Sequence, residues 1–235
     1  MIFMAADKII LWDVYGTLIV APRGDLESLL RRQDELSAAF DETASRYSLT
    51  GNLQQWFDAI RTSHAESRAR GVAHPEIRIE EIWRQLSPGL SMERAREVAL
   101  HFENRANPKR LMPEAFDTLV ALRQRGVRQG IISNAQFYTR LELTALLRAE
   151  SDCADCSYEA IFDSALVFYS CDLGVAKPDL SAFRLARERI GSAKCLFVGD
   201  SPVNDIEPAR QVGFTGLLFG PDGDIQRLSQ ILERV

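Results

Sequence analysis

Five short apolar runs constrain the fold of this chain more than any other feature of its sequence. None of them has a helical period, and stretches with the three- and four-residue spacing of amphipathic helices separate them. Such runs are typical of strands buried on both faces of a parallel sheet that helices cover. We therefore predict an α/β fold with a parallel sheet between two layers of helices. The five runs are residues 8–13, 127–133, 165–169, 194–199 and 214–219.

The long interval between the first and second runs predicts an insertion. Residues 20–108 carry helical patterns broken by Gly71, Pro75 and Pro88-Gly89, and they contain no convincing strand. We expect a Rossmann-like core formed by residues 1–19 and 109–235, with 20–108 as an inserted all-helical domain. All three histidines fall in the insertion, which excludes a Ser-His-Asp triad on the core.

Charge and composition exclude several classes of function. The chain has 235 residues, 46% of them hydrophobic, and a net charge of −5, so it has no global positive field for nucleic acid. Ile9–Trp12 is too short to cross a bilayer. The N-terminal residues do not show the basic segment and long apolar run of a signal peptide, so we expect none. We expect a cytoplasmic protein that binds a small molecule, with neither a nucleic-acid nor a membrane partner.

The cysteines fit a reducing compartment. Cys153 and Cys156 form a C-x-x-C pair, which could be redox-active or supply half of a zinc site. Cys171 and Cys195 stand alone, so a second metal-binding pair is missing and free thiols are the favoured interpretation.

Polar residues follow the apolar runs at the points where strands would end. They are Asp13, Ser133-Asn134, Lys177 in the loop after 165–169, and Asp200. Taken singly, each has an ordinary structural explanation as a turn residue, a helix cap or an exposed charge. Because the carboxyl ends of parallel strands meet at one edge of a sheet, we expect these side chains to converge there.

These residues belong to four ordered motifs that resemble those of the haloacid dehalogenase superfamily of hydrolases. The helical insertion is similar to the cap domain that this family carries after its first motif. The motifs are Asp13-Val14-Tyr15-Gly16-Thr17-Leu18, Ser133-Asn134, Lys177-Pro178-Asp179 and Gly199-Asp200-Ser201-Pro202-Val203-Asn204-Asp205.

The resemblance implies a role for each matching residue. Asp13 would be the nucleophile, a carboxylate that forms a covalent intermediate which water then cleaves. Lys177 would keep that carboxylate ionised, and Ser133 would bind substrate oxygens, with Thr17 and Asn134 as further residues of the catalytic site.

The resemblance also implies a magnesium site. Asp13, Asp200 and the backbone carbonyl of Tyr15 would supply the hard oxygen ligands that Mg²⁺ prefers. Asp205 would be an additional acidic ligand or would support the other ligands from behind. The expected substrate is then a small phosphorylated molecule, since a bound cation favours a phosphoryl group.

One position departs from the phosphatases of the family. They carry a second Asp two residues after the nucleophile, which protonates the leaving group, and this chain has Tyr15 there. A tyrosine at this place resembles the branch that hydrolyses 2-haloacids, where a halide leaves without a proton.

Other residues favour the phosphatases. The dehalogenase branch lacks the Gly199-Asp200 pair and carries a tyrosine where this chain has Phe183. It also uses a cap arginine, for which Arg31 or Arg32 could stand in, but an exposed helix face is the favoured interpretation of both. We therefore favour a magnesium-dependent phosphohydrolase, with a 2-haloacid dehalogenase and a catalytically weak phospho-ligand-binding protein as alternatives.

Overall fold

The structure is a computed structural model that describes residues 8–21, 33–151 and 153–235, without the side chains of residues 33–35. It divides into two compact units. The sheet unit comprises Met1–Val20 and Arg110–Val235, and the helical unit comprises Ala21–Lys109. Both boundaries lie one residue beyond the predicted positions.

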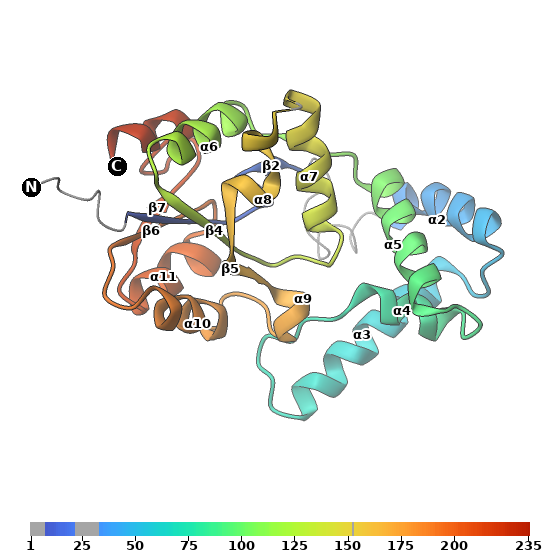
Figure 1. Cartoon of the computed structure of the whole chain (residues 1–235). Helices are drawn as coiled ribbons and strands as arrows, with labels where there is room; N and C mark the ends of the chain where they lie inside the picture. The colour runs from blue at the N-terminus through green and yellow to red at the C-terminus, as the bar shows by residue number, and fades with distance from the viewer. Residues whose placement is uncertain (1–7, 22–32, 152) are drawn as a thin grey trace, which may run out of the picture. The chain divides into compact units, whose positions relative to one another are not determined.

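A five-stranded parallel sheet forms the centre of the sheet unit, in the order β5-β4-β1-β6-β7 (Figure 1). The apolar strand β1 is buried along its whole length because it lies between β4 and β6, where Leu11 pairs with Gly130 and Phe197. The predicted α/β fold is thus confirmed, although β5 begins at Phe162 rather than Ala165. The strands are β1 (Ile9–Trp12), β4 (Arg128–Ser133), β5 (Phe162–Tyr169), β6 (Cys195–Gly199) and β7 (Thr215–Leu218).

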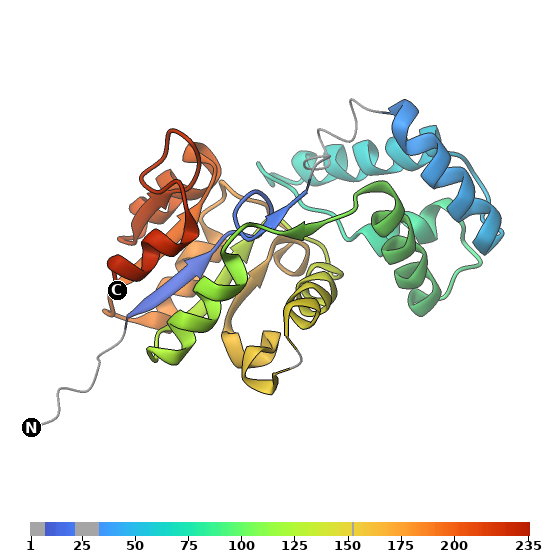
Figure 2. The same cartoon turned by 90° about the horizontal axis from the view of Figure 1, so that it is seen from above.

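Helices cover both faces of this sheet, as Figures 1 and 2 show. Side chains alternate along β1, so Ile10 and Trp12 pack into the core on one face and Ile9 and Leu11 into the core on the other. The first face carries α6 (Ala115–Gln124), α7 (Thr139–Glu150), α8 (Tyr158–Ile161) and the 3₁₀ helix Leu228–Glu233, and the second carries α10 (Ser181–Ile190) and α11 (Glu207–Gln211). None of the helices described has the length and apolar character needed to cross a bilayer.

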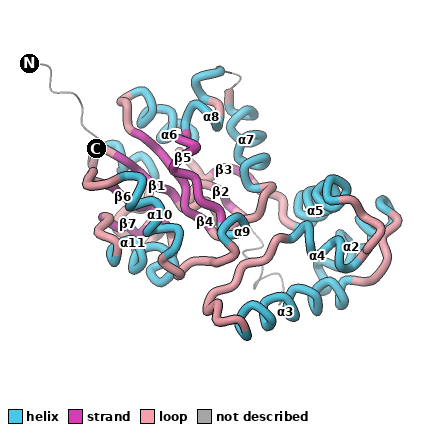
Figure 3. The backbone as a smooth tube through the Cα atoms, turned by 60° about the horizontal axis from the view of Figure 1, so that its bottom comes forward, coloured by secondary structure: helices cyan, strands magenta, loops and turns pink. Residues whose placement is uncertain are grey.

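The helical unit contains four described helices, drawn in cyan in Figure 3. Trp56 and Trp83 lie at its centre, with ring centroids 5.6 Å apart, and both rings also contact Phe102. The first helical pattern of the predicted insertion covers about residues 25–49. It falls partly outside the described residues, which contain its portion α2. The helices are α2 (Gln33–Tyr47), α3 (Leu53–Ala69), α4 (Ile79–Leu86) and α5 (Met92–Ala106).

A second, very small sheet lies where the chain passes between the two units. The strands β2 (Ile19–Val20) and β3 (Arg110–Leu111) pair in antiparallel fashion. The sequence predicts no strand from residue 20 to 108, and that expectation is wrong at Val20. Two-residue strands escape such a prediction because they are too short to show an alternating pattern.

Candidate active site

The carboxyl edge of the parallel sheet brings the predicted polar residues together. Asp13 follows β1, Ser133 is the last residue of β4, and Asp200 follows β6. Lys177 reaches the same edge from the loop between α9 (Ser170–Leu173) and α10. From β1 the chain proceeds outward to β4 and β5 on one side and later to β6 and β7 on the other. Ligands of open parallel sheets bind at such a switch in strand order.

Lys177 joins two of the carboxylates. Its Nζ lies 2.6 Å from Oδ1 of Asp13 and 2.5 Å from Oδ1 of Asp205, and it also donates to the carbonyl of Ile132. The side chains of Lys177, Asp13 and Asp205 are only 5%, 6% and 1% exposed. Burial alone lowers the pKa of the Lys177 ammonium, but Asp13 and then Asp205 outweigh that effect and hold the pKa above its ordinary value.

Two hydroxyl groups also donate to Asp13. Ser133 Oγ lies 2.9 Å from Oδ1, the oxygen that Lys177 also contacts, and Thr17 Oγ1 lies 3.4 Å from Oδ2. Asn134 is placed differently. Its side chain accepts from the backbone N–H of Lys177 and donates to the Lys177 carbonyl, so it fixes the loop that carries the lysine.

Three carboxylates meet beside Lys177. One oxygen each from Asp13, Asp200 and Asp205 lies within 4.8 Å of the others. Asp205 is further held by the backbone N–H of Ser201. Asp200 lies at the exposed rim, where partial burial, Asp13 and Asp205 raise its pKa to about 6 because each disfavours another negative charge.

Gly16 allows Asp200 to take this position. Gly16 has a φ of +89°, and a Cβ there would lie 2.0 Å from Oδ2 of Asp200. Both the backbone conformation and the close approach therefore require glycine.

This cluster fits a divalent cation. Among the described residues, three carboxylates lie beside the ammonium group of Lys177, which leaves negative charge that a cation can balance. All the donors are hard carboxylate oxygens, the ligands that suit Mg²⁺.

Tyr15 directs its side chain toward α7. Its hydroxyl lies 2.7 Å from Oγ1 of Thr139 and donates to Oε2 of Glu142 over 3.0 Å. Thr139 is fully buried and Glu142 is 8% exposed. The sequence analysis missed both residues, because a glutamate and a threonine in an amphipathic helix resemble ordinary surface positions.

Three further residues bear on the resemblance to the dehalogenases. Phe183 is fully buried in the core, with its ring centroid 5.1 Å from that of Phe197. Arg31 and Arg32 lie outside the described residues.

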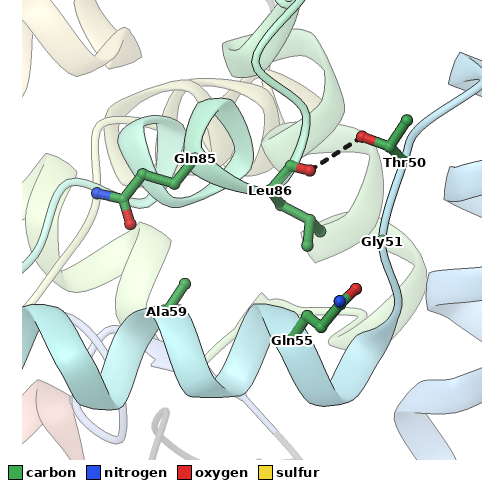
Figure 4. A pocket seen from close by; sticks show the side chains of 6 residues that line it. All are labelled: Thr50, Gly51, Gln55, Ala59, Gln85 and Leu86. Atoms are coloured by element: carbon green, nitrogen blue, oxygen red, sulfur yellow. Dashed lines mark hydrogen bonds between the residues drawn. The ribbon is translucent and has the colours of Figure 1, made fainter.

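The helical unit contains a separate cavity of about 390 Å³ (Figure 4). It lies between α3 and the end of α4, and Thr50 donates a hydrogen bond to the Leu86 carbonyl at its side. Its lining carries no charged group, which distinguishes it from the acidic edge of the sheet. The lining residues are Thr50, Gly51, Gln55, Ala59, Gln85 and Leu86.

The fold and this edge define a class of hydrolases with an aspartate after the first strand. The family model described as "haloacid dehalogenase-like hydrolase" matches residues 8–213, and the chain belongs to that family.

Two curated relatives match part of the chain. One is the haloacid dehalogenase-like hydrolase domain-containing protein 3 of Xenopus laevis, 36% identical over 47% of this chain and 41% of the relative. The other is a phosphoserine phosphatase of Thermus thermophilus, 32% identical over 53% of this chain and 47% of the relative. The match thus spans less than half the length of either relative.

Solved structures with similar folds include both chemical branches. A 2-haloacid dehalogenase from Pseudomonas syringae is 22% identical with a TM-score of 0.60, and the match covers 97% of each chain. A phosphatase of the same superfamily from Thermococcus onnurineus is 23% identical with a TM-score of 0.55, again over 97% of each chain. These likenesses establish the shared fold.

Proposed function

We propose that this protein is a magnesium-dependent phosphohydrolase that acts on a small phosphorylated molecule. The observation that carries the proposal is the cluster of Asp13, Asp200 and Asp205, whose carboxylates lie within 4.8 Å of one another beside Lys177. Transfer of a dianionic phosphoryl group benefits from a bound cation, which three carboxylates can hold. Hydrolysis of a 2-haloacid gives no comparable reason to gather these carboxylates.

Asp13 is the proposed nucleophile. Lys177 and Ser133 both donate to its Oδ1 and hold the carboxylate in position. An oxygen of Asp13 attacks phosphorus, the bond from phosphorus to the leaving group breaks, and water then cleaves the aspartyl phosphate. Lys177 and Ser133 are also the proposed donors to the phosphoryl oxygens.

Asp13, Asp200, Asp205 and the backbone carbonyl of Tyr15 are the proposed ligands of Mg²⁺. When bound, Mg²⁺ would neutralise negative charge on the phosphoryl group as it is transferred. Thr17 supports Asp13 through the hydrogen bond to Oδ2, and Asn134 positions Lys177 through the lysine backbone.

We extend the proposal to the substrate, the helical unit and the location of the protein in the cell. The phosphoserine phosphatase among the relatives supports a small phosphorylated substrate, although it matches only part of the chain. We further propose that the helical unit, Ala21–Lys109, is a cap domain that determines which substrates reach the sheet unit. The four free cysteines support a cytoplasmic location.

A 2-haloacid dehalogenase is the second candidate, and Tyr15 is the observation that favours it. The hydroxyl of Tyr15 is hydrogen-bonded to Thr139 and Glu142 of α7. A dehalogenase does not need this hydroxyl as an acid, because a halide departs without a proton. A protein that binds a phosphorylated ligand with little turnover is the third candidate.

Parallel assays separate the three candidates. Purified protein is tested for phosphate release from an aryl phosphate and for halide release from 2-chloropropionate, each with magnesium and with a chelator. We expect magnesium-dependent phosphate release that Asp13→Asn abolishes. Halide release that persists in chelator would support the dehalogenase instead. Magnesium binding without either activity would support the binding protein.

A further inference from the structure

The position two residues after the nucleophile holds a tyrosine whose hydroxyl is hydrogen-bonded to two residues of α7. The hydroxyl of Tyr15 donates its proton to Oε2 of Glu142 over 3.0 Å and lies 2.7 Å from Oγ1 of Thr139. Both partners are buried residues of α7, so the helix fixes where this hydroxyl points. Glu142 and Thr139 therefore fix the position of the Tyr15 hydroxyl.

The described groups that contact Asp13 do not replace this function. The hydroxyls of Ser133 and Thr17 donate to the two oxygens of Asp13. The ammonium of Lys177 donates to Asp13 and Asp205. Each of these protons is thus engaged by a carboxylate that the reaction needs in its ionised form.

Among the described residues, the groups that contact Asp13 thus offer no proton to a leaving group, and this limits the substrates that can react. An alkoxide is a poor leaving group, and enzymes that release one use a general acid, which contributes about 10²–10⁴-fold to the rate. A phenolate or carboxylate departs as a stable anion and needs no proton.

We propose that the substrates of this enzyme are activated phosphoryl compounds, aryl or acyl phosphates, rather than phosphate esters of ordinary alcohols. This inference rests on the proposed phosphohydrolase function and narrows its substrate class. The carrying observation is the pair of hydrogen bonds that hold the Tyr15 hydroxyl on Thr139 and Glu142.

The two chemical steps balance without a protein acid. In the first, an Asp13 oxygen bonds to phosphorus, and the bond to the leaving oxygen breaks with its electron pair, releasing phenolate or carboxylate. In the second, water bonds to phosphorus and the bond to Asp13 breaks. Both protons of that water stay on the phosphate, which passes one to the solvent. Asp13 is restored as a carboxylate.

The test is the dependence of kcat/KM on the leaving group, because kcat/KM reports the steps through transfer to Asp13. Substrates are nitrophenyl phosphate, phenyl phosphate, acetyl phosphate and a simple alkyl phosphate, all with magnesium. We expect kcat/KM for the alkyl phosphate to be at least about 100-fold below that for nitrophenyl phosphate, the loss that a missing general acid causes.

Variants at Tyr15 locate the cause of this preference. Tyr15→Asp places a carboxyl group at the position, and we expect it to raise alkyl relative to nitrophenyl hydrolysis by about tenfold or more. Tyr15→Phe keeps the ring and removes the hydroxyl. We expect the ratio of alkyl to nitrophenyl hydrolysis to stay the same, whatever the overall rate. Glu142→Gln retains an acceptor for the hydroxyl and is the matched control.

The outcomes distinguish this inference from the proposed function. Magnesium-dependent hydrolysis of the alkyl phosphate as fast as nitrophenyl phosphate would overturn the inference and leave the phosphohydrolase standing. A selective loss of alkyl hydrolysis in Tyr15→Phe would also overturn it, because the hydroxyl would then be the acid. Failure of the folded wild-type protein to release phosphate from any substrate would overturn the proposed function, and this inference with it.

Discussion

Replacing Lys177 by methionine removes the cation between two buried carboxylates and keeps most of the side-chain volume. Lys177 contacts Asp13 at 2.6 Å and Asp205 at 2.5 Å, and all three side chains are at most 6% exposed. Loss of one partner of a buried ion pair costs about 3–5 kcal/mol, because the remaining charge is left without compensation. In a chain of this length, that corresponds to a fall of about 10 °C in the unfolding midpoint.

The loss of stability in Lys177→Met depends on pH, and its direction follows from the charges involved. The pKa of Lys177 is raised above its ordinary value, so the wild-type lysine is charged throughout the range from about pH 5 to about pH 8 in folded and unfolded chains alike. Its stabilisation is therefore constant over this range. Burial already raises the pKa of Asp205, so in Lys177→Met this uncompensated carboxylate takes up a proton as the pH falls, and the loss of stability is larger at about pH 8 than at about pH 5.

Thermal unfolding followed by circular dichroism in a chelator measures this effect at both pH values. The double variant Lys177→Met/Asp205→Asn is the matched control, since it removes one of the two orphaned charges and should recover part of the loss. A midpoint within about 2 °C of wild type at about pH 8 would refute the reasoning. So would a double variant no more stable than the single one.

Three further predictions concern Gly16, Asp200 and the cysteine thiols. Gly16→Ala places a Cβ 2.0 Å from an oxygen of Asp200 at a φ of +89°, so we expect about 1–3 kcal/mol of destabilisation and loss of the magnesium-induced rise in unfolding midpoint. An undiminished magnesium response would show that Gly16 does not place Asp200. The raised pKa of Asp200, about 6, predicts that magnesium affinity measured by calorimetry falls about tenfold per pH unit below that value, because the cation competes with a proton. A flat profile would exclude Asp200 as a ligand. Burial raises the pKa of Cys195 to about 12, so mass spectrometry after thiol labelling at about pH 8 should find exposed Cys153 modified and Cys195 untouched in the folded protein. Equal labelling of both would contradict this.

The sequence predicts the sheet and much of the acidic edge for one physical reason. Strands buried on both faces appear as continuous apolar runs, and parallel strands end on the same side. The end of each run therefore locates Asp13, Ser133 and Asp200 without knowledge of the tertiary structure. The loop that carries Lys177 follows from the same argument.

Side-chain direction is what the sequence does not contain. Tyr15 belongs to a recognisable motif, but whether its hydroxyl faces the nucleophile or α7 depends on how that helix packs on the sheet. Glu142 becomes visible as its partner only after the helix is placed. Asn134 is similar, since its neighbour Ser133 contacts Asp13 while Asn134 itself binds the backbone of Lys177.

The position of β1 at the centre of the sheet has a consequence for how the protein is made. Ile9 pairs with Arg128 on one side and with Cys195 on the other, so a ribosome completes β1 long before either neighbour. Residues 21–109 emerge in between, and pairings so distant in sequence form slowly. Until β6 has been synthesised, the apolar segment Ile9–Trp12 lacks a partner on one edge and is a site for chaperone binding or aggregation. Truncated products that end before Cys195 should therefore be poorly soluble, because they retain the innermost strand without the neighbour that completes its burial.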